Sequence, residues 1–293
     1  NKCKFAQSRV EYLGYTVSGQ GIATSTSKTK AVEDWPTPRT LRDLRSFLGF
    51  ASYYRRFVKG FAKIAGPLNA LVSRMYEQTK TKKVGGKHAM LGDGWTPQCQ
   101  DAFDGLKYAL TNAPVLGYAD FTKPFILETD ASMGGLGAVL SQEQDGGRRV
   151  IAYASRTLRP TERNMQNYSS MKLELLALKW AVCEKFRYYL LGNHCVVYTD
   201  NNPLSHLQTA RLGAVEQRWA AELACFDFTI KYRSGRENRN ADALSRFPVE
   251  RPQGQEEHWT AVSCRNTVKF VEHSVVHPST VDELQEISKN ASL

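Results

Sequence analysis

The chain has 293 residues, of which 42% are hydrophobic and 23% are charged, and it carries a net charge of +10. These values exclude an intrinsically disordered protein and predict a globular chain of about two domains. No stretch approaches the roughly 20 consecutive apolar residues that a membrane helix needs, so we expect no membrane partner.

The positive charge is concentrated at the N-terminal end. Residues 1–83 hold 16 Lys and Arg against 5 Asp and Glu, a net of +11, so residues 84–293 together carry −1. Clustered positive charge indicates a partner with repeated negative charge, most often a nucleic-acid backbone, although a basic face that contacts only solvent stays an alternative. The sequence begins without Met or a signal segment, so we expect a processed piece of a longer protein.

The first elements predicted are a hairpin and a set of helices. Residues 10–17 have the composition of a strand, residues 18–21 that of a turn, and the return strand begins at 22. A helix opens at Thr40 and carries Arg42 and Arg45 on its outward face. Its inward face is apolar and comprises Leu41, Leu44, Phe47 and Leu48.

A mixed aromatic and cationic stretch follows at residues 51–59. Its Tyr54, Arg55, Arg56 and Lys59 are residue types that stack on bases or sugars and pair with phosphates. We predict that they contact nucleic acid, as do Arg42 and Arg45, with aromatic residues of a hydrophobic core as the alternative.

A polar, glycine-containing stretch at residues 77–94 predicts an exposed loop near a domain boundary. After Thr96 and Pro97 the spacing of Phe103, Leu106 and Leu110 predicts an amphipathic helix. We interpret this helix as a tether to a second domain.

The second half of the chain predicts an α/β domain with a mixed five-stranded sheet and flanking helices. The order is three strands, a long helix, a strand, two short helices, a strand and a last helix. In that order these elements are expected at 124–130, 135–141, 149–155, 169–190, 195–200, 203–208, 215–224, 226–232 and 241–246.

Four acidic residues stand out in this domain. Asp130 and Asp200 end apolar strands, Glu174 interrupts an apolar helix, and Asp242 begins the last helix. Each aspartate also has a purely structural interpretation, as a turn residue or as a charge favoured at a helix N-terminus. Glu174 is different, because the residues three and four positions away include no basic partner: Ser170, Met171, Ala177 and Leu178.

These four carboxylates predict a metal site if the sheet brings Asp130 and Asp200 side by side. Repulsion among them is usually relieved by two hard divalent ions, here Mg²⁺, with Mn²⁺ able to replace it. One ion would activate a water and the other would stabilise the leaving 3′ oxygen, which amounts to cleavage of a phosphodiester.

The motifs around the acids resemble the ribonuclease H domain of gypsy-class LTR retrotransposon Pol polyproteins. They are Thr-Asp-Ala-Ser at 129–132, Glu-Leu-Leu-Ala at 174–177, Tyr-Thr-Asp-Asn at 198–201 and Asn-Ala-Asp-Ala-Leu-Ser-Arg at 240–246. The N-terminal part is similar to the thumb of the same reverse transcriptases, through Tyr-Leu-Gly at 12–14, Leu-Gly-Phe at 48–50 and Tyr-Tyr-Arg-Arg-Phe at 53–57.

The resemblance implies a domain plan. Residues 1–25 would end the polymerase palm as a hairpin, 26–76 would form a helical thumb-like domain, and 77–117 would be a loop and tether helix. Residues 118–247 would form the ribonuclease H-like domain, and 248–293 a partly disordered linker toward an integrase.

The resemblance also implies an activity: Mg²⁺-dependent endonucleolytic cleavage of the RNA strand of RNA–DNA hybrids, with Asp130, Glu174, Asp200 and Asp242 as catalytic metal ligands. Hybrid and duplex backbones, recognised without base reading, would be contacted by further residues of the nuclease domain: Ser132, Asn201 and Asn238. The implied partners are the polymerase fingers and palm and the integrase, and a dimer stays open. A cytoplasmic particle or the nucleus is the implied location.

Two features depart from the family pattern. The chain contains no Asp-Asp pair, so we expect no polymerase activity from it alone. No His lies between His206 and His258, where many ribonucleases H carry a loop histidine, so we expect slower turnover with metal binding intact. The alternatives are a catalytically inactive nucleic-acid-binding scaffold from a decayed or domesticated element and, less favoured by the layout of the acids, an integrase core.

Overall fold

The computed structural model describes residues 7–81, 89–164, 168–205, 207 and 212–233. Several sequence predictions lie outside these residues: Asn238, Asp242, the last helix at 241–246 and the linker at 248–293. Within the described ranges, no helix combines the length and the apolar character needed to cross a membrane.

The chain begins with a small antiparallel sheet of three strands, β1 (Arg9–Tyr12), β2 (Tyr15–Ser18) and β3 (Gly21–Thr24). The prediction of one strand over residues 10–17 is wrong, because the chain reverses at Leu13 and Gly14. Both residues have positive φ, 48° and 82°, the backbone of a tight two-residue hairpin turn. The predicted turn at residues 18–21 does connect β2 to β3.

Among the described residues, the helical segments that follow are α1 (Thr26–Glu33), α2 (Leu41–Tyr53), the 3-10 helix η1 (Arg55–Phe57), α3 (Phe61–Ile64), α4 (Gly66–Thr81), the 3-10 helix η3 (Gly92–Gly94) and α5 (Pro97–Thr111). Thr40 caps α2, since its hydroxyl accepts from the main-chain N–H of Asp43 and the Asp43 carboxylate accepts from Thr40 in return. The predicted apolar face of α2 is buried. The predicted loop starts too early, because α4 continues past Glu77 to Thr81.

Helix α5 forms where predicted, but it is built into the N-terminal core and does not stand free as a tether. Its apolar face is buried with residues of α2 and α4, and Phe103 packs on Phe47 with ring centroids 4.5 Å apart. This core, formed by residues between Ile22 and Leu116, defines the N-terminal module. A second core, formed by residues from Ala119 to Phe226, defines the C-terminal domain.

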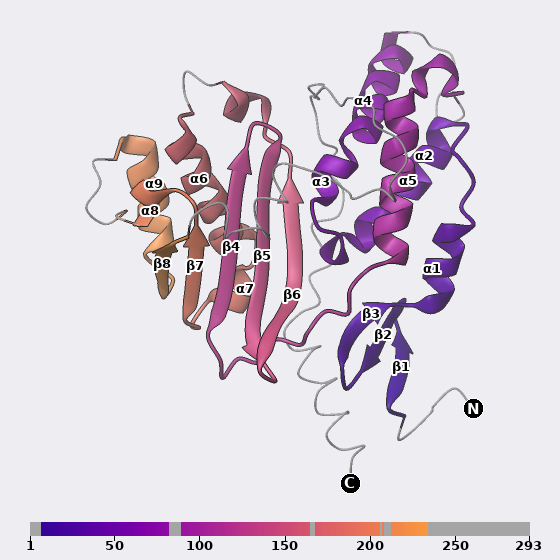
Figure 1. The fold of residues 1–293 in the computed structure, drawn as a ribbon. Helices are drawn as coiled ribbons and strands as arrows, with labels where there is room; N and C mark the ends of the chain where they lie inside the picture. The colour runs from indigo at the N-terminus through magenta and orange to yellow at the C-terminus, as the bar shows by residue number, and fades with distance from the viewer. Residues whose placement is uncertain (1–6, 82–88, 165–167, 206, 208–211, 234–293) are drawn as a thin grey trace.

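The C-terminal domain contains the mixed five-stranded sheet that the sequence predicted, and that prediction is confirmed. The strand order is β6-β5-β4-β7-β8 (Figure 1), in which β7 lies parallel to both β4 and β8 and the other pairs are antiparallel. The bounds are β4 (Phe125–Ser132), β5 (Gly135–Gln144), β6 (Gly147–Arg156), β7 (Cys195–Thr199) and β8 (Phe228–Tyr232).

The predicted helix over residues 169–190 is interrupted. It consists of α6 (Ser170–Lys179), a π-helical segment (Trp180–Lys185) and α7 (Arg187–Leu190). Phe186 N donates to Ala181 O at 2.8 Å, a five-residue step that widens the turn, and Phe186 enters the core there. The other helical segments among the described residues of this domain are the 3-10 helix η4 (Pro160–Arg163), α8 (Asn202–Ser205) and α9 (Ala214–Leu223).

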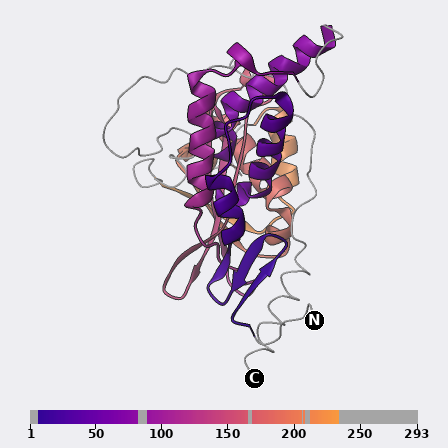
Figure 2. The ribbon, with the colours of Figure 1, turned by 90° about the vertical axis from the view of Figure 1, so that its right-hand side faces the viewer.

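The N-terminal module packs against β6, an edge strand of the C-terminal sheet (Figure 1). Viewed from the side of the module, its helices stand above the three-stranded sheet and in front of the C-terminal domain (Figure 2). The connecting chain is hydrogen-bonded to both parts: Ile22 and Leu116 exchange main-chain hydrogen bonds of 2.8 Å, and Gly117 N donates to Val150 O of β6 at 2.8 Å. The two parts are therefore joined by packing as well as by the chain.

Candidate metal centre

Two aspartates lie at the ends of neighbouring parallel strands. β4 and β7 are paired up to Glu128 opposite Tyr198, and Asp130 and Asp200 each follow two residues beyond this pair. Carboxyl ends of adjacent parallel strands meet at one edge of a sheet, which brings the two aspartates together there. The condition on which the predicted metal site depended, that Asp130 and Asp200 lie side by side, is met in the structure.

Glu174 reaches the same edge from α6. The helix begins after Ser169, whose hydroxyl accepts from Lys172 N at 3.3 Å. Glu174 is surrounded by buried apolar residues of its own helix, and its Oε1 accepts a hydrogen bond of 3.1 Å from Ala131 N, directly after Asp130. The apolar packing of α6 on the sheet therefore fixes the carboxylate against β4.

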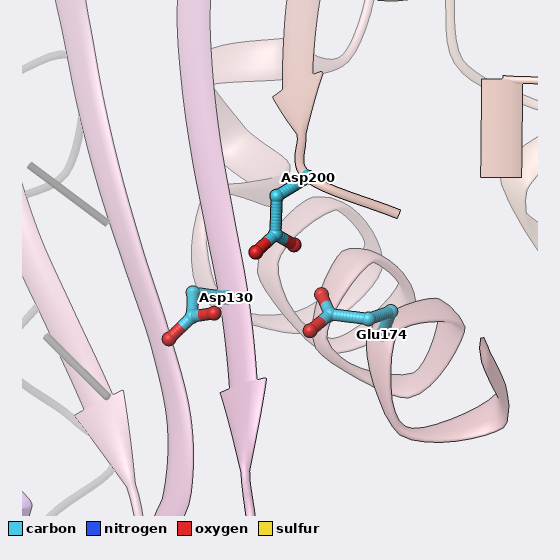
Figure 3. A group of neighbouring side chains, drawn as sticks. All are labelled: Asp130, Glu174 and Asp200. Atoms are coloured by element: carbon cyan, nitrogen blue, oxygen red, sulfur yellow. The ribbon is translucent and has the colours of Figure 1, made fainter. Parts of the chain in front are cut away.

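Together, Asp130, Glu174 and Asp200 place one carboxylate oxygen each within 4.8 Å of one another. The carboxylates of Glu174 and Asp200 point toward the space between the three residues, and one oxygen of Asp130 faces them (Figure 3). Asp130 is 4% exposed and Glu174 5% exposed, whereas Asp200 is half-buried. Burial and, to a smaller extent, the charges of Asp130 and Asp200 raise the pKa of Glu174 to about 9, while the hydrogen bond from Ala131 N acts in the opposite direction.

The residues fit a divalent cation. The donor set consists of carboxylate oxygens, which hard ions such as Mg²⁺ prefer. In addition, Glu174 Oε2 is buried and accepts no hydrogen bond within the described part of the chain. A buried carboxylate oxygen facing two further carboxylates is costly without a cation. The structure thus brings three of the four predicted ligands together, and Asp242 lies outside the described residues.

The polar residues predicted beside the acids are close to them in the chain. Ser132 ends β4, and its hydroxyl accepts a hydrogen bond from Gly134 N at 3.2 Å. Asn201 follows Asp200, and its main-chain N–H donates to Thr199 Oγ1 at 3.1 Å. The Asn201 side-chain oxygen is buried and has no hydrogen-bond partner among the described residues.

The cations predicted to contact nucleic acid fall into two groups. Arg42 is exposed on α2, Arg45 is half-buried with its guanidinium 5.5 Å from the Tyr76 ring centroid, and Lys59 is half-buried. Arg55 and Arg56 instead point into the junction with the C-terminal domain. Arg55 Nη2 donates to Ser155 O at 2.7 Å and Arg56 Nη2 donates to Ile151 O at 3.2 Å.

This placement corrects part of the prediction. Tyr54 is 3% exposed and its hydroxyl donates to Gly14 O at 2.9 Å, so its ring cannot stack on a base in this structure. Burial also lowers the pKa of the Arg55 guanidinium. The aromatic and cationic pattern at residues 51–59 arises because the module uses aromatic rings for its core and arginines to satisfy main-chain carbonyls of β6.

The sequence analysis missed Glu128, which precedes Asp130 by two residues on β4. Glu128 is 1% exposed, and its Oε1 accepts from Arg148 Nη1 at 2.8 Å and from Arg233 Nη1 at 3.3 Å. Both guanidinium groups also lie near the Tyr198 ring, with centroid distances of 5.8 Å and 3.9 Å. The position of Glu128 inside an apolar strand could have identified it as a residue with a specific role. Its partners Arg148 and Arg233 could not be inferred, because they are distant in sequence.

Comparisons with known proteins agree with this geometry. A family model described as an RNase H-like domain found in reverse transcriptase matches residues 95–197. Residues 95–197 therefore match an RNase H-like domain of the reverse-transcriptase kind.

Among curated proteins, the Pol polyproteins of the Drosophila melanogaster transposons opus and gypsy are 38% identical over 251 residues and 40% identical over 248 residues. These matches cover 85% and 84% of this chain but only 24% and 23% of the relatives, so the chain spans about a quarter of their length. Over most of its length the chain is similar to gypsy-class Pol polyproteins, and the resemblance inferred from its motifs is confirmed.

The fold is similar to that of a solved foamy viral protease-reverse transcriptase in complex with an RNA/DNA hybrid. The TM-score is 0.63 at 22% sequence identity, and the match covers 87% of this chain and 32% of that chain. A foamy viral protease-reverse transcriptase in complex with dsDNA gives a TM-score of 0.62 at 24% identity and covers 78% of this chain and 45% of that chain. Each match covers a larger fraction of this chain than the C-terminal domain makes up. Both matches therefore include the N-terminal module as well as the sheet.

Proposed function

We propose that this chain is a Mg²⁺-dependent endoribonuclease that cuts the RNA strand of RNA–DNA hybrids as part of a retrotransposon reverse transcriptase. One observation carries the proposal: three carboxylates from β4, α6 and the end of β7 converge within 4.8 Å inside an RNase H-like domain. Asp242, whose motif resembles that of the family, is proposed as the fourth ligand.

The chain's own residues prepare this site in three ways. Asp130, Glu174 and Asp200 would hold the cations, which when bound supply an activated water and stabilisation of the leaving 3′ oxygen. Ala131 N fixes Glu174 through its Oε1, and Oε2 is left buried without a hydrogen-bond partner among the described residues. Burial of Asp130 and Glu174 keeps bulk water away and strengthens every electrostatic interaction there.

The substrate proposal follows from the family and from the charge of the N-terminal module. Hybrid would be recognised through its backbone and the 2′-hydroxyls of the RNA strand, without base reading. Arg42, Arg45 and Lys59, with Ser132 and Asn201 at the site, are the proposed contacts among the described residues. The polymerase part and the integrase of the same polyprotein are the proposed partners.

Cleavage of a labelled RNA–DNA hybrid in Mg²⁺ or Mn²⁺ tests the proposal. The parent chain should cut only the RNA of the hybrid, and Asp130→Asn should cut neither hybrid, single-stranded RNA nor duplex DNA. The matched control is Asp145→Asn, an exposed aspartate in the turn between β5 and β6, which should cut like the parent. If the parent and Asp130→Asn bind hybrid equally and neither cuts it, the chain is an inactive nucleic-acid-binding scaffold.

A further inference from the structure

A lysine of the N-terminal module, Lys63, shares a hollow with Ser132, two residues after Asp130 of the candidate metal centre. Lys63 belongs to α3, which packs against β6. The neighbouring Ala62 N donates to Ser155 Oγ at 2.9 Å, and Arg55 Nη2 donates to Ser155 O at 2.7 Å. Two hydrogen bonds to a single residue of β6 therefore fix the backbone beside Lys63 relative to the sheet.

The surroundings of Lys63 connect it to the carboxylates. Lys63 lines a hollow between the two parts of the molecule, together with Ser132 at the end of β4, Gly134 in the turn after it and Gly135 at the start of β5. Its ammonium group interacts favourably with the charge of Asp130, which partly offsets the lowering of the Lys63 pKa by burial. A positive charge from one module is thus placed at the edge of the acidic cluster of the other.

A cation at this position has a specific use in the reaction. A nucleic-acid backbone approaches the site as a row of negative phosphates, while Asp130, Glu174 and Asp200 present negative charge to it. A lysine beside the carboxylates attracts the phosphate next to the one held at the metal centre, because a flexible ammonium group binds phosphate oxygens as a point charge.

We propose that Lys63 binds the phosphate backbone of the strand being cut, next to the carboxylate cluster, so that the N-terminal module completes the substrate site of the nuclease. This proposal rests on the proposed function. The alternative is a structural lysine that only balances the charge of Asp130 within the protein. The two alternatives differ in whether removal of the ammonium group weakens hybrid binding.

The first test compares the parent chain with Lys63→Met, which keeps an unbranched apolar side chain, and Lys63→Arg, which keeps the charge. On hybrid, Lys63→Met should raise KM by about tenfold, the loss typical of one charge-assisted hydrogen bond, while kcat stays within about twofold. Lys63→Arg should restore most of the affinity. The matched control is Lys30→Met on α1, an exposed lysine of the same module, which should behave like the parent.

A binding measurement separates this proposal from the activity itself. Hybrid affinity is measured across a salt series for Glu174→Gln with and without Lys63→Met, because this comparison does not require cleavage. One lost phosphate contact should reduce the slope of log affinity against log salt by about 0.9. An unchanged slope and an unchanged KM would overturn the role of Lys63 even if the parent cuts hybrid. If the parent does not cut, a reduced slope would still support Lys63 as a phosphate contact.

Discussion

Two charged regions lie beside the same sheet, and they differ in how their charges are satisfied. At the ends of β4 and β7, three carboxylates face one another, and Glu174 Oε2 accepts no hydrogen bond within the described residues. Along β6, Arg55 and Arg56 donate to main-chain carbonyls. Like charges gathered around an unsatisfied oxygen indicate a site for an ion, whereas charges with partners inside the protein hold its parts together.

The largest expected effect comes from Glu174→Gln. It should lower hybrid cleavage by at least about a thousandfold, since an amide is a poor ligand for the cations that stabilise the transition state. The metal-free protein should gain about 1 to 2 kcal/mol of unfolding free energy, because a buried carboxyl group with a raised pKa costs stability at pH values above its ordinary pKa. Cleavage rates and denaturant unfolding without metal measure the two effects.

The same variant should also lose the response to metal. Mg²⁺ or Mn²⁺ is expected to raise the melting temperature of the parent by binding the folded state, and this rise should be much smaller in Glu174→Gln. Asp145→Asn, which changes an exposed acid, should keep both the response and the activity. Equal metal-induced stabilisation of the parent and Glu174→Gln would contradict the assignment of Glu174 as a ligand.

A smaller effect is expected at the other region. Arg55→Met should reduce the free energy of unfolding by about 2 to 3 kcal/mol, because it removes a charge-assisted hydrogen bond and leaves the Ser155 carbonyl without that donor. Hydrogen exchange should rise in α3 and β6 in particular, since these elements pack on each other there.

Arg42→Met serves as the control for this prediction, because Arg42 is an exposed arginine of the same module. Its unfolding free energy should change by no more than about 0.5 kcal/mol. If Arg55→Met unfolds like the parent, the hydrogen bond to Ser155 does not hold the two parts together. A loss of hybrid affinity without a loss of stability would instead restore Arg55 as a nucleic-acid contact.

The difference between the two regions also explains what could be predicted from the sequence. The sequence revealed three acids because each interrupts or ends an apolar strand or helix: Asp130, Asp200 and Glu174. Parallel pairing of β4 with β7 then brings the two aspartates together. Arg55 was misinterpreted because its partner, the Ser155 carbonyl, is distant in sequence and lies across the junction. A main-chain acceptor leaves no signature in residue types.

The fold shows the same limit. The five strands of the C-terminal domain can be predicted from the alternation of apolar and polar residues and from the turn residues between them. Two local features differ from the prediction, the turn at Leu13 and the π-helical segment after Lys179, and the cause of each leaves only a weak signal in the sequence. Leu13 adopts a positive φ that leucine rarely takes, and the π-helical segment after Lys179 preserves the apolar pattern of a continuous helix. The role of α5 in the N-terminal core depends on which helices pack together, and its own amphipathic pattern does not specify this.

The smallest expected effect concerns Arg42, which lies neither at the carboxylate cluster nor among the arginines that donate to β6. Arg42 is exposed on α2, so a nucleic-acid contact there would be a solvent-accessible ion pair. Arg42→Ala should weaken hybrid binding only about two- to threefold and reduce the salt slope by about 0.9, with folding unchanged. Arg218→Ala, an exposed arginine on α9, is the matched control and should leave both quantities unchanged. If the salt slope of Arg42→Ala equals that of the parent, α2 does not contact the backbone, and the positive charge of that face is only solvated.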